Sequence, residues 1–185
     1  MDGRIWQAAG RETVLHRAYL DTPLGAVWAV FSPQGLCLLE FADTPKLQAE
    51  IAALARAKRA CFAEADGQDG RVEVLRAELA AYFSGSLKTF ATPVEMVGTP
   101  FQCAVWRVLQ GVPYGETRSY AQQAAALGNA RAVRAVAAAN GRNKVSLLLP
   151  CHRIIGSNGS LTGYAGGLWR KQALLELERN NVQAA

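Results

Sequence analysis

The sequence predicts an α/β (α+β) chain made of two unlike parts. Short apolar runs separated by turn residues occupy residues 13–42, and two alanine-rich stretches with helical spacing follow them. The second half is mostly helical and holds one short apolar run, directly before a cysteine and a histidine. The 185 residues suffice for one ordinary domain or two small ones. We expect an N-terminal part at 1–92, a linker at 93–98 and a C-terminal part at 99–185.

The N-terminal part is expected to combine three strands with two helices. The strands are expected at Thr13–Asp21, Gly25–Ser32 and Gly35–Ala42, because the turn signals TPL and PQ separate these runs. Strands this close in sequence predict an antiparallel meander. Helical spacing predicts one helix in Thr44–Phe62 and another in Gly70–Gly85.

Two helices with clear end signals open the C-terminal part. Thr99 is expected as an N-cap, with Pro100 at the first helical position and the end of the helix before Gly111. In the next helix, Ser119 as N-cap and Gln122 three residues later form a capping box.

A glycine turn then leads into a third helical segment. Gly128 is expected to end the second helix, and Asn129 to cap a helix over Ala130–Asn140. Helix, short turn and helix is the helix-turn-helix pattern of DNA-binding proteins. Arg131 and Arg134 on the third segment favour this interpretation, although a well-packed interior helix rich in alanine fits the pattern too.

The rest of the chain is expected to carry a strand, a hairpin and a helix. The apolar run Val145–Pro150 predicts a short buried strand, after which CHRII turns the chain. Asn158-Gly159 is a strong hairpin signal, and the glycines of 163–167 let backbone approach a small flat ligand. An amphipathic helix is expected over Leu168–Asn180.

Composition excludes several classes of protein. Four scattered cysteines, Cys37, Cys61, Cys103 and Cys151, form no CxxC pair, which argues against a disulfide framework and against a structural zinc site. No apolar run is long enough to cross a membrane, and the polar N-terminus lacks the pattern of a signal peptide. We therefore expect a cytosolic (cytoplasmic) protein with free thiols and no metal.

Charge is spread unevenly over the two halves. Residues 1–96 hold ten basic and twelve acidic side chains, a net charge of −2, whereas 97–185 hold ten basic and three acidic ones, a net charge of +7. A basic second half is consistent with binding to a polyanion such as nucleic acid, and equally with an ordinary basic surface.

Cys151 and His152 are the residues most suited to chemistry. A free thiol has a pKa near ~8.5, so a nucleophilic cysteine needs a base or a positive environment. Neighbouring side chains in an extended segment point apart, so either the chain turns here or a water joins the sulfur to the imidazole. The histidine also needs an acceptor, and Glu176 and Glu178 are the only acidic residues after Glu116. The alternative is a buried cysteine beside a surface histidine and a surface arginine, Arg153.

Three stretches together resemble a known family. LLLPCHRIIG, GSLTGYAGG and LWRKQALLELE, with GTPFQCAVW before them, are similar to the O6-alkylguanine-DNA alkyltransferases, also called methylated-DNA–protein-cysteine methyltransferases. The resemblance implies a ribonuclease-H-like N-terminal domain and a winged-helix-like C-terminal domain. It implies direct-reversal DNA repair, in which the alkyl group of O6-alkylguanine, and of O4-alkylthymine, moves irreversibly to Cys151 in a single turnover. Such a stoichiometric enzyme needs no cofactor.

The resemblance also assigns roles in the chemistry. Cys151 corresponds to the acceptor, His152 to the base that works through a water, and Glu178 to the carboxylate that orients it. We expect Cys151 to be ionised. Further residues correspond to a hinge, a guanine contact and a support of the site, namely Asn143, Tyr120 and Lys171. The walls of the base pocket correspond to Ser146, Ile154, Tyr164, Ala165 and Gly166.

Double-stranded DNA with alkylated guanine is the implied partner, bound through the minor groove by a monomer, with cooperative binding left open. Arg134 corresponds to the arginine that replaces the flipped nucleotide. Other residues expected to contact DNA are Ala135, Tyr120, Arg142 and Lys144. Lys144 stands where the family usually has proline, which predicts a stronger salt dependence of binding. Small Ser146 and Ala165 suggest room for alkyl groups larger than methyl.

Three alternatives belong to other classes. A lesion sensor of the alkyltransferase-like kind would bind without transfer, but such proteins replace the cysteine. A cysteine hydrolase would leave the basic helix-turn-helix unexplained. A transcription factor would need long side chains on the second helix to read bases, and this helix offers mostly alanine.

Overall fold

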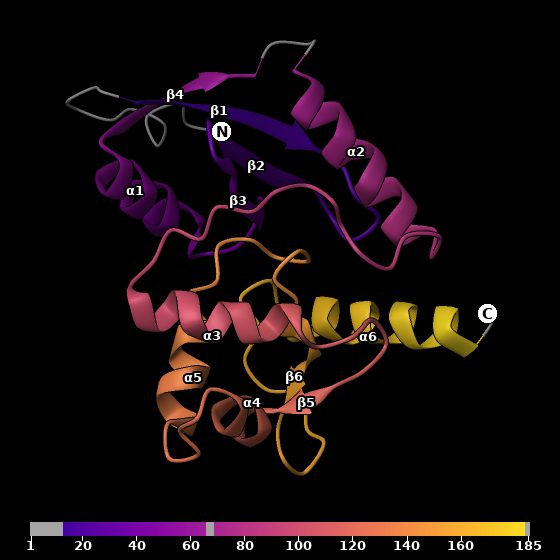
Figure 1. Cartoon of the computed structure of the whole chain (residues 1–185). Coiled ribbons are helices and arrows are strands. Elements are labelled where there is room, and N and C mark those ends of the chain that lie inside the picture. Colours follow the sequence, from indigo (N-terminus) through magenta and orange to yellow (C-terminus); the bar gives the residue numbers. More distant parts are fainter. Residues whose placement is uncertain (1–12, 66–68, 184–185) are drawn as a thin grey trace.

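The computed structural model describes residues 13–65 and 69–183. Most of the polar N-terminal segment, in which no signal-peptide pattern was found, lies outside the described residues. Four strands form one sheet in the order β3 (Gly35–Phe41), β2 (Val27–Ser32), β1 (Thr13–Leu20) and β4 (Ala60–Glu64). The sheet and two helices make up one half of the molecule, and the remaining helices make up the other (Figure 1). The expected mixture of sheet and helices is therefore present.

The antiparallel meander is confirmed. β1 (Thr13–Leu20) pairs with β2 (Val27–Ser32), and β2 pairs with β3 (Gly35–Phe41). The register shifts between Val30 and Phe31, so that Cys37 becomes the extra residue of a bulge.

The first helix is shorter than expected. α1 spans Leu47–Lys58 and ends at Arg59, whose φ of 48° is left-handed. The residues after it form β4 (Ala60–Glu64), which runs parallel to β1. The expectation of helix through Phe62 was wrong. The apolar and alanine-rich composition continues from α1 into β4, so it does not show where the helix ends and the strand begins. β4 completes a mixed sheet.

The two faces of the sheet are covered by different elements. Leu15, Trp28 and Val30 face buried residues of α1 on one side. On the other side, the sheet packs with α2 (Gly70–Phe83) and with the buried residues of the C-terminal half in one hydrophobic cluster. The two halves therefore share a core, and burying such apolar surface is the main stabilising term of the fold.

The segment between the halves runs along the free edge of β3. The amide of Leu36 donates to the carbonyl of Pro93, and Leu36 forms a parallel bridge with Val94. This segment crosses between the sheet and α3 in Figure 1. The expected extended piece is present, while the exact boundary at 93–98 stays a prediction.

The helix ends of the C-terminal half follow the expected signals. α3 spans Pro100–Gln110, with Thr99 and Gln102 in a capping box. α4 spans Tyr120–Ala126, with a second capping box formed by Ser119 and Gln122. Each box supplies partners to backbone N–H groups that a helix start leaves free.

The third helical segment begins later than expected. α5 spans Val133–Asn140 and has no side-chain cap, while Asn129 accepts a hydrogen bond from the amide of Arg131 in the turn before it. Because Asn129 closes a local turn of its own, it cannot cap the helix. Gly128 has the expected positive φ, 81°.

Two buried contacts fix α5 against its neighbours. The side-chain amides of Gln123 and Asn140 exchange two hydrogen bonds, and Nε1 of Trp106 donates to the carbonyl of Ala139 at 2.9 Å. α4 and α5 lie at the end of the molecule away from the sheet (Figure 1). The helix pair is thus a rigid unit that presents an outer surface.

The expected strand at Val145–Pro150 is absent. Val145 forms a single parallel bridge with Leu39, after which Leu147 adopts a φ of 71° and the chain continues in tight turns. All residues of this run are buried. Complete burial of an apolar run looks the same in sequence for a strand and for a compact turn.

Short elements and a long helix close the fold. Cys151–Arg153 is a single 3-10 turn, followed by β6 (Ile154–Ile155), which pairs in parallel with β5 (Arg118–Ser119). Gly159 sits in a turn with φ 82°, but no hairpin ladder flanks it. α6 spans Leu168–Gln183. Among the described residues, no helix is long and apolar enough to cross a membrane.

Candidate active site

Cys151 lies half-buried at the start of the 3-10 turn, where Asn143 contacts it. The side-chain amide of Asn143 donates to the carbonyl of Leu149 at 2.8 Å and approaches Sγ of Cys151 at 3.3 Å. Its carbonyl oxygen accepts from the amide of Val145. Asn143 therefore fixes both ends of the turn that presents the sulfur.

The thiol is not ionised at rest, contrary to expectation. Burial raises the pKa of Cys151, and the hydrogen bond from Asn143 offsets this only in part. A thiol with a raised pKa is a poor nucleophile at neutral pH until a base removes its proton. A nucleophilic role for Cys151 would therefore require a base nearby.

His152 contacts the last helix through Glu178. Its side chain is fully buried, and Nε2 lies 2.8 Å from Oε1 of Glu178. The 3-10 turn explains the arrangement, because successive side chains of the turn point in different directions. Glu176, the other acidic candidate, is exposed and accepts a hydrogen bond from Gln172.

Glu178 is buried and accepts hydrogen bonds from four residues. Besides His152, the hydroxyl of Tyr82 donates at 2.7 Å, the guanidinium of Arg153 donates to both oxygens, and the amide of Gly115 donates at 3.0 Å. Burial alone would raise the pKa of this carboxyl, but the contacts of His152 and Arg153 outweigh it and hold the pKa far below its usual range. Glu178 is therefore ionised.

The ionised carboxylate fixes the tautomer of His152. Burial lowers the pKa of His152, so the imidazole is neutral. A carboxylate only accepts, so Nε2 carries the single proton and Nδ1 keeps a free lone pair. Nδ1 is buried and has no hydrogen-bond partner among the described residues. A buried acceptor of this kind is suited to a bound water and to proton uptake.

Lys171 and Tyr120 fasten the loop that faces the thiol. Nζ of Lys171 is buried and donates to the carbonyls of Ile154 and Thr162, and burial lowers its pKa to about 8. The hydroxyl of Tyr120 donates to the carbonyl of Thr162 at 3.1 Å. Burial raises the pKa of Tyr120, so this hydroxyl stays protonated and able to donate.

The expected pocket residues come from three segments of the C-terminal half. Ser146, Ile154 and Gly166 are buried, whereas Tyr164 and Ala165 are half-buried. The hydroxyl of Tyr164 is buried, and burial, with Cys151 nearby, raises its pKa well above the ordinary value. A donor at this position could meet a polar ligand atom beside the sulfur.

Glycine is required at Gly166 because two rings crowd it. A Cβ added there would lie 2.8 Å from Tyr164 and 2.9 Å from Phe41. The carbonyl of Gly166 accepts from Arg170, whose guanidinium also bonds Asp43 and stacks on Phe41. The pocket loop is thereby tied to the N-terminal half.

The expected DNA-contacting residues do not share one surface. Arg134 and Ala135 are exposed on α5, and Arg142 is exposed just after it. Lys144 instead turns inward, where its ammonium donates to the carbonyl of Val97 at 3.0 Å and lies over the ring of Trp106. Lys144 therefore already has partners within the protein, and its contact with DNA stays a prediction.

Sequence reasoning missed Tyr82, Gly115 and the role of Arg153. Tyr82 is one aromatic position among several in an ordinary amphipathic helix, and only the folded chain brings it to Glu178. Arg153 was open to interpretation as a surface residue, yet it is buried against the carboxylate. The one sequence signal that pointed to this cluster was the small number of acidic residues in the basic C-terminal half, which left few candidates to pair with His152. Within the described ranges, no three His, Cys, Asp or Glu side chains gather around a possible metal site.

Comparison with known families matches the C-terminal half to one model. Residues 100–180 match the model described as 6-O-methylguanine DNA methyltransferase, DNA binding domain. Among curated proteins, the methylated-DNA–protein-cysteine methyltransferase of Methanosarcina barkeri is 42% identical over 164 residues, covering 89% of this chain and 97% of that protein. The protein of the same name from Mycobacterium leprae is 40% identical over 91% of this chain and 95% of its own length.

Solved structures are similar along nearly the whole chain. The O6-methylguanine methyltransferase of Mycobacterium tuberculosis superposes with a TM-score of 0.75 at 37% identity, covering 90% of this chain and 94% of that one. The M. tuberculosis OGT in complex with DNA has a TM-score of 0.74 at 35% identity, covering 91% and 94%. Both parts of the fold are therefore similar to the same solved proteins.

Proposed function

Because the chain belongs to the family of methylated-DNA–protein-cysteine methyltransferases and carries out direct-reversal DNA repair by alkyl transfer to a cysteine, we propose that Cys151 is the acceptor. His152 is the base and Glu178 its orienting partner. The observation that carries this assignment is the chain of contacts from ionised Glu178 to Nε2 of His152, which leaves Nδ1 free and buried.

The proposed reaction moves one alkyl group and one proton. Sγ of Cys151 forms a bond to the alkyl carbon while the bond from that carbon to O6 of guanine breaks. The thiol proton passes through a bound water to Nδ1 of His152, and the imidazolium then releases it. The departing guanine takes up one proton, so no net charge is created. A thioether has no good leaving group, which makes a single turnover the expected outcome.

Pre-placed donors would stabilise guanine as it leaves. The hydroxyls of Tyr120 and Tyr164 are both kept protonated by burial, and both lie near Cys151. Donors fixed where negative charge develops lower the barrier, because they need no reorganisation during the reaction. In the free protein Tyr120 donates to Thr162, so its hydroxyl must rotate to reach the base.

DNA is the partner of this chain. We propose that the protein binds DNA as a monomer and that its α4–α5 pair contacts the minor groove. O6 of guanine is inaccessible in a duplex, so the nucleotide must leave the stack at a cost of a few kcal/mol. Exposed Arg134 would fill the vacated space, while the small Ala135 beside it permits close approach of the helix. The lesion expected is O6-alkylguanine.

Intact-protein mass spectrometry tests the proposal directly. The chain is mixed with a duplex that carries one O6-methylguanine, and the mass of the protein and the modified peptide are measured. We expect the gain of one methyl group on Cys151 and its absence in Cys151→Ser. Cys103→Ser is the matched control, because Cys103 is half-buried in the same half but only donates to the carbonyls of Met96 and Gly98.

Two results would contradict the assignment. Methyl transfer to a cysteine other than Cys151 would remove the proposed site. Tight binding of the lesion with no mass gain would identify a sensor that binds alkylated DNA without repairing it.

A further inference from the structure

A buried group of charges from the N-terminal half lies against the hinge of the candidate site. Lys46, the residue before α1, places its ammonium 2.8 Å from Oε2 of Glu40 and 3.0 Å from Oε1 of Glu50. Glu40 is completely buried. None of these three residues takes part in the proposed chemistry, so the burial of the two carboxylates requires another explanation.

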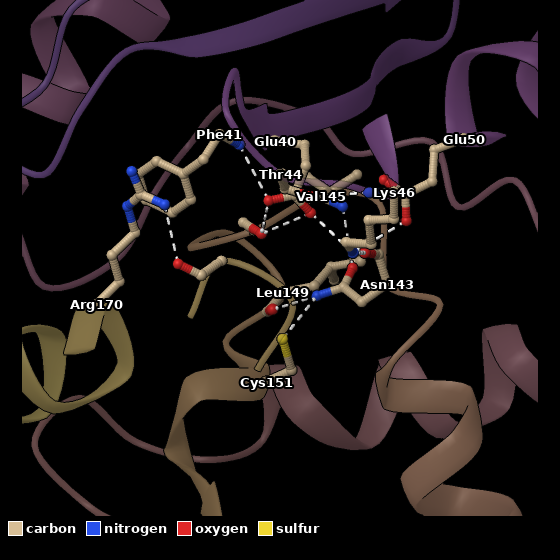
Figure 2. A network of polar contacts seen from close by, with 12 residues as sticks. Glu40, Phe41, Thr44, Lys46, Glu50, Asn143, Val145, Leu149, Cys151 and Arg170 are labelled. Atoms are coloured by element: carbon tan, nitrogen blue, oxygen red, sulfur yellow. Dashed lines mark hydrogen bonds and ion pairs between the residues drawn. The ribbon is translucent and has the colours of Figure 1, made fainter. Parts of the chain in front are cut away.

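The same ammonium also holds the hinge. Nζ of Lys46 donates to the backbone carbonyl of Asn143 at 2.9 Å. Figure 2 shows the lysine lying between Glu50 and Asn143, with Cys151 directly beyond the asparagine. The side-chain amide of Asn143 contacts the sulfur at 3.3 Å. Only one residue therefore separates the ammonium from the candidate acceptor.

Backbone contacts join the two halves at the same place. The amide of Leu39 donates to the carbonyl of Lys144, and the amide of Ser146 donates to the carbonyl of Leu39, both at 2.8 Å. The hydroxyl of Ser146 lies 3.4 Å from both carboxylate oxygens of Glu40. The charged group is thus part of a continuous connection between β3 and the segment before Cys151.

We propose that Lys46 is a positioning residue for alkyl transfer: it anchors the backbone of Asn143 so that the asparagine amide stays on the sulfur of Cys151. This inference rests on the proposed function of Cys151. Glu40 and Glu50 hold the ammonium in place, and Glu40 also braces Ser146. The N-terminal half thereby supplies an essential support for a site built mainly from the C-terminal half.

Electrostatics support the geometry. Burial would lower the pKa of Lys46, but the two carboxylates outweigh it and raise the pKa, so the cation persists. Its charge lowers the pKa of Cys151, whereas that of Glu40 raises it. The second cation facing the group is Lys144. The other titratable groups around the thiol are Tyr120, His152, Tyr164 and Lys171.

The test measures the reactivity of Cys151 towards a small electrophile, independently of DNA. Iodoacetamide alkylates each variant across a pH series, and mass spectrometry of the Cys151 peptide gives the rate. In Lys46→Met, loss of the cation should move the inflection of the rate to higher pH and lower the rate at neutral pH by roughly threefold or more, which corresponds to about half a pKa unit. Lys46→Arg keeps the charge and should recover most of the rate.

A matched control separates positioning from general stability. Lys58, also at α1, is as exposed as Lys46 (21% against 22% of the side chain), and its ammonium pairs with Glu95 rather than with Glu40 or Glu50. Lys58→Met should lose an ion pair yet keep the pH profile of the wild type. Affinity for unmodified duplex should stay unchanged in Lys46→Met, because Lys46 lies outside the α4–α5 pair.

A double variant covers the case in which Lys46→Met fails to fold because Glu40 is left buried and unpaired. In Lys46→Met/Glu40→Gln the two charges disappear together, so the inflection should return towards the wild-type pH. Methyl transfer from O6-methylguanine duplex at saturating DNA should still be slow, because Asn143 remains unanchored.

The outcomes distinguish this inference from the function on which it rests. A wild-type chain that accepts no methyl group refutes the proposed function, whatever the iodoacetamide profile. An active wild type whose Lys46→Met and double variants both react and transfer at the wild-type rate refutes only the role of Lys46.

Discussion

The hydroxyl of Tyr82 donates a 2.7 Å hydrogen bond to Oε1 of Glu178, which joins the two halves of the chain inside the shared core. Tyr82 comes from α2, and its ring also packs against Tyr114 with centroids 5.9 Å apart. The carboxylate that orients His152 thus depends on a donor from the N-terminal half. Together with Lys46, this contact joins that half to the proposed active site.

Tyr82→Phe should weaken both stability and transfer. A buried hydrogen bond to a charged group contributes about 1.5–3 kcal/mol, and its loss leaves Glu178 with one fewer donor. Urea denaturation should show a loss of that size, and the rate of methyl transfer should fall moderately. Tyr114→Phe is the control, since its hydroxyl accepts from Asn181 and does not touch Glu178. Equal losses in the two variants would contradict the special role of Tyr82.

Glu178→Gln should impair removal of the thiol proton by His152 while leaving the thiolate of Cys151 reactive at high pH. Without the carboxylate, His152 loses the acceptor that fixes its tautomer, and general-base catalysis is worth about 10²–10⁴-fold. We expect methyl transfer at pH 7 to fall by roughly 10²-fold and to keep rising with pH through the raised pKa of Cys151. Rates are followed by quenched transfer from labelled duplex.

Glu176→Gln provides the comparison for this variant. Glu176 lies on the same helix but is exposed. It should transfer methyl groups at the wild-type rate across the pH range. A defect as large as that of Glu178→Gln would mean that the helix, and not the carboxylate, is responsible.

Arg134→Ala should impair repair of duplex DNA much more than reaction with the free base O6-benzylguanine. Arg134 is exposed on α5 and does not contact Cys151, so the chemistry itself is preserved. Loss of one cationic contact should also reduce the slope of binding against salt concentration by about one. Arg56→Ala, an exposed arginine on α1, is the control. Equal losses on duplex and free base would remove the assigned role.

Glu50→Gln should change how stability depends on pH. Burial raises the pKa of Glu50 to about 7, although Lys46 opposes this. The folded state therefore binds the proton more tightly than the unfolded one, and stability falls as pH rises from about 4.5 to about 7. The full effect is about 3 kcal/mol, since one pKa unit corresponds to 1.36 kcal/mol.

Glutamine does not titrate, so the variant should escape that loss. Urea denaturation at pH 5 should give similar stabilities for both proteins, and at pH 8 the variant should be the more stable. Glu73→Gln, at an exposed position on α2, should follow the wild type at both values. A variant that is less stable at pH 8 would mean that the ion pair with Lys46 outweighs the cost of burying the charge of Glu50.

Local signals predicted the elements best where side chains act on their own backbone. The capping boxes at Thr99 and Ser119 set helix starts correctly, because their hydrogen bonds reach only three residues. The segment Val145–Pro150 could not be predicted, because its turns are imposed by burial and by one bridge to Leu39. β4 was missed for a similar reason, since it exists only through pairing with β1.

Only the site residues that belong to a recognisable sequence motif could be predicted. Cys151 and His152 stand together in sequence, and the resemblance singled out Glu178, which the fold brings to His152. Tyr82 lies 96 residues from Glu178 in the sequence, and Lys46 lies 97 residues from Asn143. No sequence pattern around either residue marks it as part of the site. Lys144 was expected to contact DNA because of its charge, and that stays a prediction; in the folded chain its ammonium contacts the carbonyl of Val97 and the ring of Trp106.

The bridges of Leu36 to Val94 and of Leu39 to Val145 have a further consequence for solubility. β3 ends the sheet, and an open edge is a template on which a second molecule can add a strand. Here two segments of the same chain cover that edge, namely the segment around Val94 that joins the two halves and the segment around Val145 that follows the hinge. Loosening the hinge should therefore promote self-association as well as slow repair.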